Sequence, residues 1–318
     1  MRTPTLLLAV LTVAFVRAQD LTPQVIATQG GSGTVAGVSL DWTLGEFMNE
    51  TLWNGPNYLT QGFLQAEPIQ VQVNMRALLD GPYLASSGLM VDSLRAQGLI
   101  PLSEPYTALG FYHVEGGNET TTAPVLAITG PDAIIDWVVV ELRHQFDEGE
   151  VMATASALLQ RDGDVVAEDG VSPVRLKQPA GSYFVAVHHR NHLAVMTLNT
   201  VALTSAPTAI DFTTLNTATY GTNARKSVSG AFPAEVLWAG DVDFNNELKY
   251  TGSFNDRDPI LLAIGGSIPT AVLSGQYRAE DVNMDASVKY VGANNDRDPI
   301  LQNIGGSVPT NTRPGQLP

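Results

Sequence analysis

Apolar and β-branched residues gather in short runs through the middle of the chain, and turn residues separate these runs. In the runs around residues 134–142 and 182–189 the apolar residues are too dense for a strand with one wet face. Such runs are typical of buried strands in two packed sheets. We expect strands at residues 69–79, 108–114, 123–128, 133–144, 151–161, 164–169, 173–177 and 182–190. The pattern therefore predicts a mainly β fold, a β-sandwich of the Ig-like or jelly-roll type.

Two local signals refine this picture. A helical pattern occurs at residues 89–98, where Gly98 is suited to end a short helix. Asp162–Gly163 is typical of a hairpin turn, since it separates two strand-like runs.

The first residues have the features of a signal peptide. A basic Arg2 precedes an apolar stretch from Leu6 to Val16, and a small residue, Ala18, precedes the expected cut. The apolar stretch is too short to span a bilayer, and no later segment is long enough to be a membrane helix. We predict a signal peptide at 1–18, a β-hairpin segment at 19–67, the sandwich at 68–204, a connector at 205–239 and tandem repeats at 240–318, and hence a secreted or cell-surface protein.

Charge and cysteine usage narrow the candidate functions. The formal net charge is −15, and removing residues 1–18 with their two arginines brings it to −17. So acidic a protein is a poor partner for nucleic acid or for anionic membranes. The chain has 0 cysteines, so an exported protein of this sequence relies on core burial or on metal ions for its stability.

The C-terminal part contains a duplication. Residues 241–270 and 281–310 match at a constant offset of 40, with 18 of 30 positions identical. Each copy is therefore expected to be one structural unit. Each opens with oxygen-bearing side chains on alternate residues, the arrangement of a loop around a hard cation.

An EF-hand loop places ligands at positions 1, 3, 5, 7, 9 and 12, the seventh through its carbonyl oxygen. With Asp241 at position 1, position 12 would fall on Gly252, which has no side-chain ligand. If residues 249–254 are an insertion, Asn255 takes position 9 and caps the following helix, and Asp258 takes position 12. Gly265 then ends that helix.

We predict two calcium ions. The expected ligands are Asp241, Asp243, Asn245, Glu247 (carbonyl), Asn255 and Asp258 in the first repeat, and Asp281, Asn283, Asp285, Ser287 (carbonyl), Asn295 and Asp298 in the second. Asp256 and Asp296 remain alternative ligands, because the loop length does not fix which acid faces the ion. The usual glycine at position 6 is replaced by Asn246 and Ala286, and alanine is poorly suited to the positive φ of that position.

Several motifs carry a family resemblance. The pieces WTLGE and LTQGF near the N-terminus resemble a segment of secreted Bacteroidetes proteins. The motifs at 81–111, 136–143, 160–166 and 188–197 resemble secreted Bacteroidetes proteins of the hemagglutinin-like type, and the paired loops resemble a dockerin module, apart from the insertion. These resemblances imply cell-surface traffic and adhesion.

Catalytic motifs are weak. His189 and His192 are spaced for zinc, but a strand-end cluster with diverging side chains is the favoured interpretation. Asp162 and Asp164 could form a glycosidase pair, although the hairpin turn explains them better. We therefore predict a non-enzymatic adhesin that binds an unidentified cell-surface glycan or protein. The alternatives are a docking module that carries a carbohydrate-binding sandwich, and a hydrolase of unrecognised type.

Overall fold

The structure is a computed structural model that describes residues 29–35, 38–44, 51–54, 57–60 and 70–318. The chain divides into two compact units, Met1–Ala66 and Glu67–Pro318. The predicted signal peptide at 1–18 lies outside the described residues. In the first unit, β1 (Gln29–Val35) pairs with β2 (Val38–Leu44), and β3 (Thr51–Asn54) pairs with β4 (Asn57–Thr60), both antiparallel.

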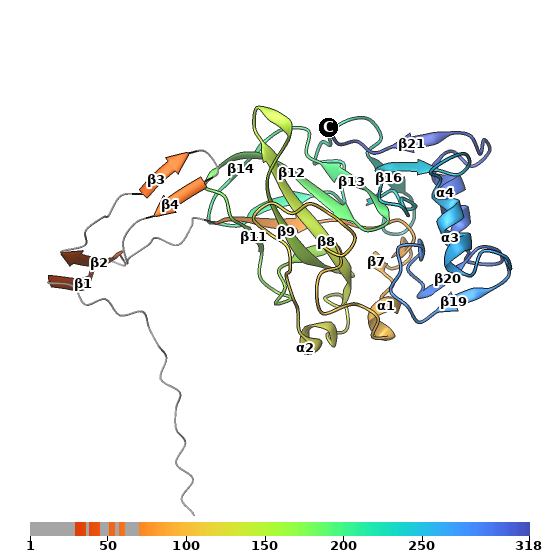
Figure 1. Cartoon of the computed structure of the whole chain (residues 1–318), viewed down its shortest axis with the longest axis horizontal. Helices are drawn as coiled ribbons and strands as arrows, with labels where there is room; N and C mark the ends of the chain where they lie inside the picture. Colours follow the sequence, from red (N-terminus) through yellow and green to blue (C-terminus); the bar gives the residue numbers. More distant parts are fainter. Residues whose placement is uncertain (1–28, 36–37, 45–50, 55–56, 61–69) are drawn as a thin grey trace, which may run out of the picture. The chain divides into compact units, whose positions relative to one another are not determined.

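A nine-stranded sheet dominates the second unit (Figure 1). Its strands are β5 (Val71–Arg76), β8 (Ile134–His144), β9 (Asp147–Gln160), β10 (Asp164–Val166), β11 (Val174–Leu176), β12 (Gly181–His189), β13 (His192–Met196), β14 (Val201–Leu203) and β15 (Thr208–Asp211). The strand order is β11-β5-β10-β9-β8-β12-β13, with β14 beside β12 and β15 beside β5. Only the β15–β5 pair is parallel among these described pairs. The predicted mainly β fold is confirmed.

The dense apolar runs form the core as predicted. Every residue of β8 except His144 is buried, including Trp137 and Leu142, which are 0% exposed. Burying a side chain of this size contributes about 1.5–3 kcal/mol. The strand is covered on both faces, which explains why its sequence lacks a polar alternation.

Two expected strands do not form. Residues 108–114 fold as turns and irregular backbone around Gly110, which has φ 85°. Residues 123–128 contain a helix, α2 (Ala123–Leu126), because Pro124 lies in its first turn, where the missing N–H is no loss, and Thr122 enters in an extended conformation. The predictions of strands at both places are wrong.

The other local predictions are confirmed. A short helix, α1 (Ser93–Ala96), is followed by Gly98 with φ 66°. It lies after the small hairpin of β6 (Tyr83–Leu84) and β7 (Leu89–Met90). The turn between β9 and β10 has Gly163 at φ 96°, as a tight hairpin requires.

The connector is more regular than its sequence suggests. Its first part forms β15 inside the large sheet. Its second part forms a hairpin of β16 (Arg225–Val228) and β17 (Ala234–Leu237). Trp238 follows, and the Arg313 guanidinium lies 3.6 Å from its ring centroid, so Trp238 packs against the repeats.

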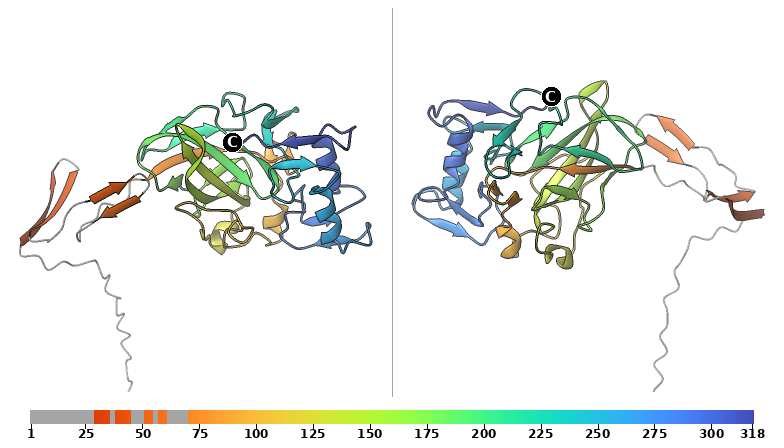
Figure 2. Two further views of the ribbon diagram at one scale, coloured as in Figure 1. Left: turned by 45° about the horizontal axis from the view of Figure 1, so that its top comes forward. Right: turned by 180° about the vertical axis from the view of Figure 1, so that it is seen from behind.

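Each repeat is a loop, a short strand, a helix and a second short strand. The first has β18 (Glu247–Lys249), α3 (Arg257–Ala263) and β19 (Val272–Ser274), and the second has β20 (Ser287–Lys289), α4 (Arg297–Asn303) and β21 (Thr312–Pro314). The strands are exchanged, because β18 pairs with β21 and β19 pairs with β20. The two helices lie side by side at one end of the large sheet (Figure 2). No helix in the described part of the chain is long and apolar enough to cross a membrane.

Candidate metal centre

The first repeat folds its opening loop around Asp241. The carboxylate accepts the backbone N–H groups of Asn245 at 2.9 Å and Asn246 at 3.1 Å. Phe244 and Asn246 have φ values of 59° and 65°, and these left-handed residues turn the backbone N–H groups inward. Asn246 thus takes the left-handed role that sequence analysis assigned to position 6.

Asp256 closes the same loop from the far side. Its side chain is completely buried and accepts the backbone N–H of Val242 at 2.8 Å and that of Lys249 at 2.7 Å. Its own N–H donates to the carbonyl of Lys249 at 2.9 Å. Asp256 therefore joins the acidic loop, β18 and the start of α3.

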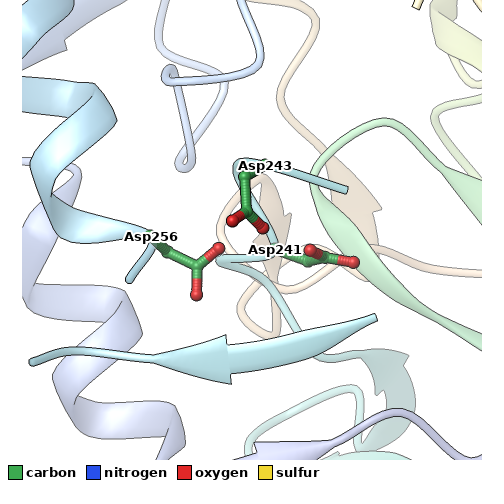
Figure 3. A group of neighbouring side chains, drawn as sticks. All are labelled: Asp241, Asp243 and Asp256. Atoms are coloured by element: carbon green, nitrogen blue, oxygen red, sulfur yellow. The ribbon is translucent and has the colours of Figure 1, made fainter. Parts of the chain in front are cut away.

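These bonds bring three carboxylates together. Asp241, Asp243 and Asp256 each offer one oxygen, and the three oxygens lie within 4.8 Å of one another (Figure 3). Asp241 and Asp256 are buried, whereas Asp243 is exposed. The group could hold a metal ion, because one loop and one helix start bring its oxygens close together.

Electrostatics distinguishes these acids from ordinary surface carboxylates. Burial raises the pKa of Asp241 to about 7, and the neighbouring Asp243 adds to the effect. Burial and the charge of Asp241 raise the pKa of Asp256 to about 8. None of the ion pairs among the described residues involves these three acids. A bound cation would supply the missing positive charge and keep them ionised.

The second repeat builds the same loop. Asp281 accepts the backbone N–H of Asp285 at 3.1 Å and that of Ala286 at 2.9 Å. Ala286 has φ 71°, so the loop adopts the left-handed conformation even with alanine at that position. Asp296 accepts the N–H groups of Val282 at 2.8 Å and Lys289 at 2.7 Å, as Asp256 does in the first copy.

Asp281 and Asp296 of the second loop are also buried, and their surroundings do not fully offset the cost of burying their charge. Burial raises the pKa of Asp281 to about 6 and that of Asp296 to about 8. Asp285 places Oδ2 3.1 Å from the ammonium of Lys289, while its Oδ1 is buried without a hydrogen-bond partner. Such an orphaned carboxylate oxygen suits a cation ligand. Among the described residues, only the first repeat brings three acidic groups within 4.8 Å.

The structure separates Asp258 and Asp298 from the loop acids. In each case Oδ1 pairs with the preceding arginine and Oδ2 accepts the side-chain amide N–H of the preceding asparagine. Their side chains are 53% and 46% exposed. The alternatives named in the sequence analysis, Asp256 and Asp296, are the acids that lie at the loops.

Asn255 and Asn295 act as helix caps. Each Oδ1 accepts the backbone N–H of the aspartate three residues later at 2.9 Å. Each side-chain amide donates to a glycine carbonyl in the inserted segment and to the same aspartate. The predicted capping bonds form, but the asparagines stand one residue before the helix N-caps Asp256 and Asp296. These bonds occupy the polar atoms of both asparagines.

The remaining expected ligands lie within or next to the loops. In the first loop, Asn245 donates its amide to Asp243 at 2.9 Å and accepts the N–H of Glu247 at 2.8 Å. In the second, Asn283 donates to the carbonyl of Asn294 at 2.9 Å. Glu247 and Ser287 are the first residues of β18 and β20.

A buried polar network joins the repeats to the large sheet. The Arg190 guanidinium donates to Asp136 at 2.9 Å, stacks over the Tyr277 ring at 4.4 Å and bonds the carbonyl of Arg278. The Tyr277 hydroxyl donates to the same carboxylate. Burial alone would raise the pKa of Asp136, but the charge of Arg190 and the hydrogen bond from His189 lower it far below its usual range.

Asn191 contacts the acidic loops of both repeats at once. Its carbonyl accepts the N–H of Gly240 at 2.9 Å and that of Asp241 at 3.2 Å. Its side-chain amide donates to the carbonyls of Ala279 and Asp281, each at 2.9 Å. Sequence reasoning missed this role, since a polar residue in a strand turn is normally solvated. Its only signal was that the run HHRNH follows a strongly apolar strand.

A second feature of the sheet is a polar cavity of about 580 Å³. Residues of the segment 115–119, the middle of β9 and the β10–β11 loop line it. Its lining includes Glu168 and Arg175, both exposed, and Ser156, which is 2% exposed and has a hydroxyl without a hydrogen-bond partner. The cavity thus presents positively and negatively charged side chains together with a neutral hydroxyl.

Comparisons with known proteins do not identify the chain further: no protein-family model, no curated protein and no solved structure matches it.

Proposed function

We propose that this chain is a secreted, non-enzymatic adhesin whose C-terminal repeats are stabilised by two calcium ions. The observation that carries the proposal is the convergence of buried Asp241 and Asp256 with Asp243 in the first repeat, where no described ion pair neutralises them. The second repeat builds the same loop around buried Asp281 and Asp296. Secretion and adhesion rest on the signal-peptide pattern and on the hemagglutinin-like motifs.

The spacing of the oxygens suits calcium. Calcium takes oxygen ligands at about 2.3–2.6 Å, so two oxygens on opposite sides of the ion are at most about 4.6–5.2 Å apart. The three oxygens of the first repeat fall inside that limit, at 4.8 Å or less. Carboxylate oxygens around a loop are the ligand set of a hard cation, whereas zinc prefers nitrogen and sulfur ligands.

The expected role of calcium is structural. Two carboxylates are buried at each loop, Asp241 with Asp256 and Asp281 with Asp296. Their mutual repulsion is removed when an ion binds them. At about 1 mM calcium and a dissociation constant of about 10 μM, each site would add about 2.7 kcal/mol to the free energy of unfolding.

Calcium titration of residues 19–318 tests the proposal. We expect calorimetry to show saturable binding and the melting temperature to rise with calcium concentration. Magnesium is the matched control, because it requires tighter octahedral geometry and should stabilise the protein far less. Equal melting temperatures with calcium and with a chelator would refute the calcium role.

The fold that carries the adhesive surface is inferred to be a two-layer sandwich. Val73 in β5 and Val185 in β12 belong to one buried cluster although three strands separate β5 from β12 in the sheet order. A sheet that curls over a single core accounts for this. A crystal structure that placed the two strands in a single flat layer would contradict it.

The polar cavity is the proposed ligand site of the adhesin. Its volume falls in the range of small-ligand pockets. Its mixed charges suit a neutral ligand rich in hydroxyl groups, such as a sugar residue, because each hydroxyl both donates and accepts. We expect Glu168→Ala and Arg175→Ala to weaken binding on a glycan array, with Glu150→Ala, exposed and outside the cavity lining, as control.

A docking role is the second candidate, supported by apolar side chains that the repeats leave exposed. Phe254 in the first inserted segment is 83% exposed and Leu262 in α3 is 71% exposed. A protein partner that covers them would be captured by the wild type and lost by Phe254→Ser with Leu262→Ser. Glycan binding that survives these changes would favour adhesion.

A further inference from the structure

Two buried histidines face each other where the large sheet meets the repeats. His189 ends β12 and His192 begins β13, and their exposed fractions are 0% and 1%. Their Nδ1 atoms are 2.9 Å apart, and Nδ1 of His192 is also 2.8 Å from Oδ1 of Asn191. Three polar atoms therefore meet in a place without solvent.

The outer nitrogens fix the tautomer of both rings. Nε2 of His189 lies 3.1 Å from a carboxylate oxygen of Asp136, and Nε2 of His192 lies 2.8 Å from the carbonyl oxygen of Asp80. Both partners are acceptors, so each Nε2 carries the hydrogen. A neutral imidazole has one N–H only, and both Nδ1 atoms consequently present lone pairs.

The orientation of the Asn191 amide is fixed as well. Its nitrogen donates to two carbonyl oxygens, those of Ala279 and Asp281. Rotating the amide would bring its oxygen against both carbonyls. The atom that faces His192 is therefore the amide oxygen, which only accepts hydrogen bonds.

Three acceptors thus converge with no hydrogen between them. A buried acceptor without a donor costs about 1–3 kcal/mol, and the other tautomer of His189 only moves the conflict to Asp136. We propose that His189, Asn191 and His192 form a buried cation site, in which the three lone pairs bind one proton or one transition-metal ion.

The distances among the three acceptor atoms are compatible with a proton and with a metal ion. Separations of 2.8 and 2.9 Å are hydrogen-bond distances, so a proton on His192 Nδ1 would satisfy both neighbours. A metal ion at about 2.0–2.1 Å from two nitrogens 2.9 Å apart would subtend an angle of about 90°, which suits copper(II) or nickel(II) better than tetrahedral zinc. The outer bonds to Asp136 and Asp80 are of the kind that orient metal-binding histidines.

The surrounding charges oppose each other. Burial lowers the pKa of both imidazoles, and Arg190 acts in the same direction, while the carboxylate of Asp136 favours a positive charge. The carboxylate of Asp80 is turned to Lys226 at 2.8 Å, and Tyr277 bonds Asp136. Imidazole binds a metal ion in its neutral form. Where no metal is bound, the contacts among the three acceptor atoms favour an added proton on His192 Nδ1.

The site would connect the sheet to both repeats. A cation held against Asn191 Oδ1 fixes the side-chain amide of Asn191, whose nitrogen donates to the carbonyl of Asp281. The backbone carbonyl of Asn191 accepts the N–H of Asp241. One buried cation thereby orients the residue between the two acidic loops.

Two measurements on the intact chain test the inference. Elemental analysis after dialysis against copper, nickel or zinc measures bound metal, and nitrogen-15 spectra of the imidazoles count their N–H groups in metal-free protein. Stoichiometric metal that is lost in His189→Gln supports the metal source. An imidazolium, with hydrogen on both nitrogens of one ring between pH 6 and 8, supports the proton.

The inference is overturned if the wild type binds no such metal and both rings carry a single N–H throughout that pH range. This result needs no variant, so a misfolded variant cannot hide it. His144→Gln is the control, since His144 lies outside the site and its side chain is 35% exposed. Calcium titration of the same samples keeps the proposed calcium role separate.

Discussion

Asp136 and Asp256 are both completely buried, yet the protein's own side chains neutralise only one of them. Asp136 accepts hydrogen bonds from Arg190, His189 and Tyr277, and these hold its pKa far below the usual range against the effect of burial. Asp256 accepts two backbone N–H groups, and burial with the nearby charge of Asp241 raises its pKa to about 8.

The difference shows what hydrogen bonds alone can do for a buried carboxylate. Two backbone donors orient Asp256, but they do not replace the positive charge that Arg190 supplies to Asp136. The charge of Asp136 is therefore balanced within the chain, whereas no ion pair among the described residues balances Asp256, and we propose that an ion from solution does so. If the loops bind such an ion as proposed, the stability of the repeats changes with the ion concentration of the medium.

The largest expected effect comes from breaking the complete pair. Arg190→Met leaves Asp136 buried without its counter-charge, and such a change typically costs about 3–5 kcal/mol of unfolding free energy. Urea unfolding should show this loss with calcium and with chelator alike. Arg175→Met is the control, because Arg175 is exposed, and it should change stability by less than about 0.5 kcal/mol.

The next effect separates two neighbouring acids in one repeat. Asp256→Asn should remove calcium stabilisation from the first loop, about 2.7 kcal/mol at a calcium concentration 100 times the dissociation constant. Asp258→Asn should keep it, because Asp258 pairs with Arg257 outside the loop. Calorimetric titration of both variants decides the matter, and loss of binding in Asp258→Asn alone would restore the original assignment of position 12.

The pH dependence tests the same comparison without mutation. Burial raises the folded-state pKa of Asp256 and Asp296 to about 8, well above the unfolded value near 3.9. Their contribution to stability is present below pH 4 and is lost as the pH rises toward 8, so the calcium-free protein should melt at a lower temperature at pH 8 than at pH 5. Saturating calcium should remove most of this decline.

The double variant Asp256→Asn with Asp296→Asn is the matched control for that measurement. With both acids replaced, the melting temperature of the calcium-free protein should depend less on pH between 5 and 8. An unchanged slope would assign the decline to other groups.

The smallest expected effect concerns the left-handed residue of the second loop. Ala286→Gly relieves a strain of about 1–2 kcal/mol at φ 71°, but it loses a buried methyl worth about 0.8 kcal/mol and the lower chain entropy of alanine in the unfolded state. The net change should stay below about 1 kcal/mol in thermal unfolding. Ala286→Val, with a β-branched side chain at the same φ, should destabilise clearly more.

The sequence predicted the first acids of each loop better than the acid that completes it from the start of the helix. Alternating acids at a repeated offset indicated Asp241 and Asp243 directly, since period and chemistry are both local properties. The choice between Asp256 and Asp258 depends on how the inserted segment returns to the loop. In the structure the Lys249 N–H, at the end of β18, donates to the Asp256 carboxylate. The numbering of a standard loop does not contain this information.

The same distinction holds for the large sheet. Continuous apolar runs predicted β8 and β12 correctly, because both faces of β8 are buried and β12 has one buried and one half-buried face. The parallel strand β15 was missed, since its short run TAID has no strong pattern and pairs with β5, more than 130 residues earlier. The role of Arg190 was also missed, because its partner Asp136 lies in an otherwise apolar strand.

The exchanged strands make the duplication indivisible. Among the described strands, β18 of the first repeat pairs only with β21, which is more than 60 residues further along the chain, and β19 pairs only with β20 of the second repeat. The first copy therefore cannot finish folding before residues 312–314 have left the ribosome. A proteolytic cut between the copies would leave two fragments that still need each other, and a loss of residues 312–318 would open the first repeat as well as the second.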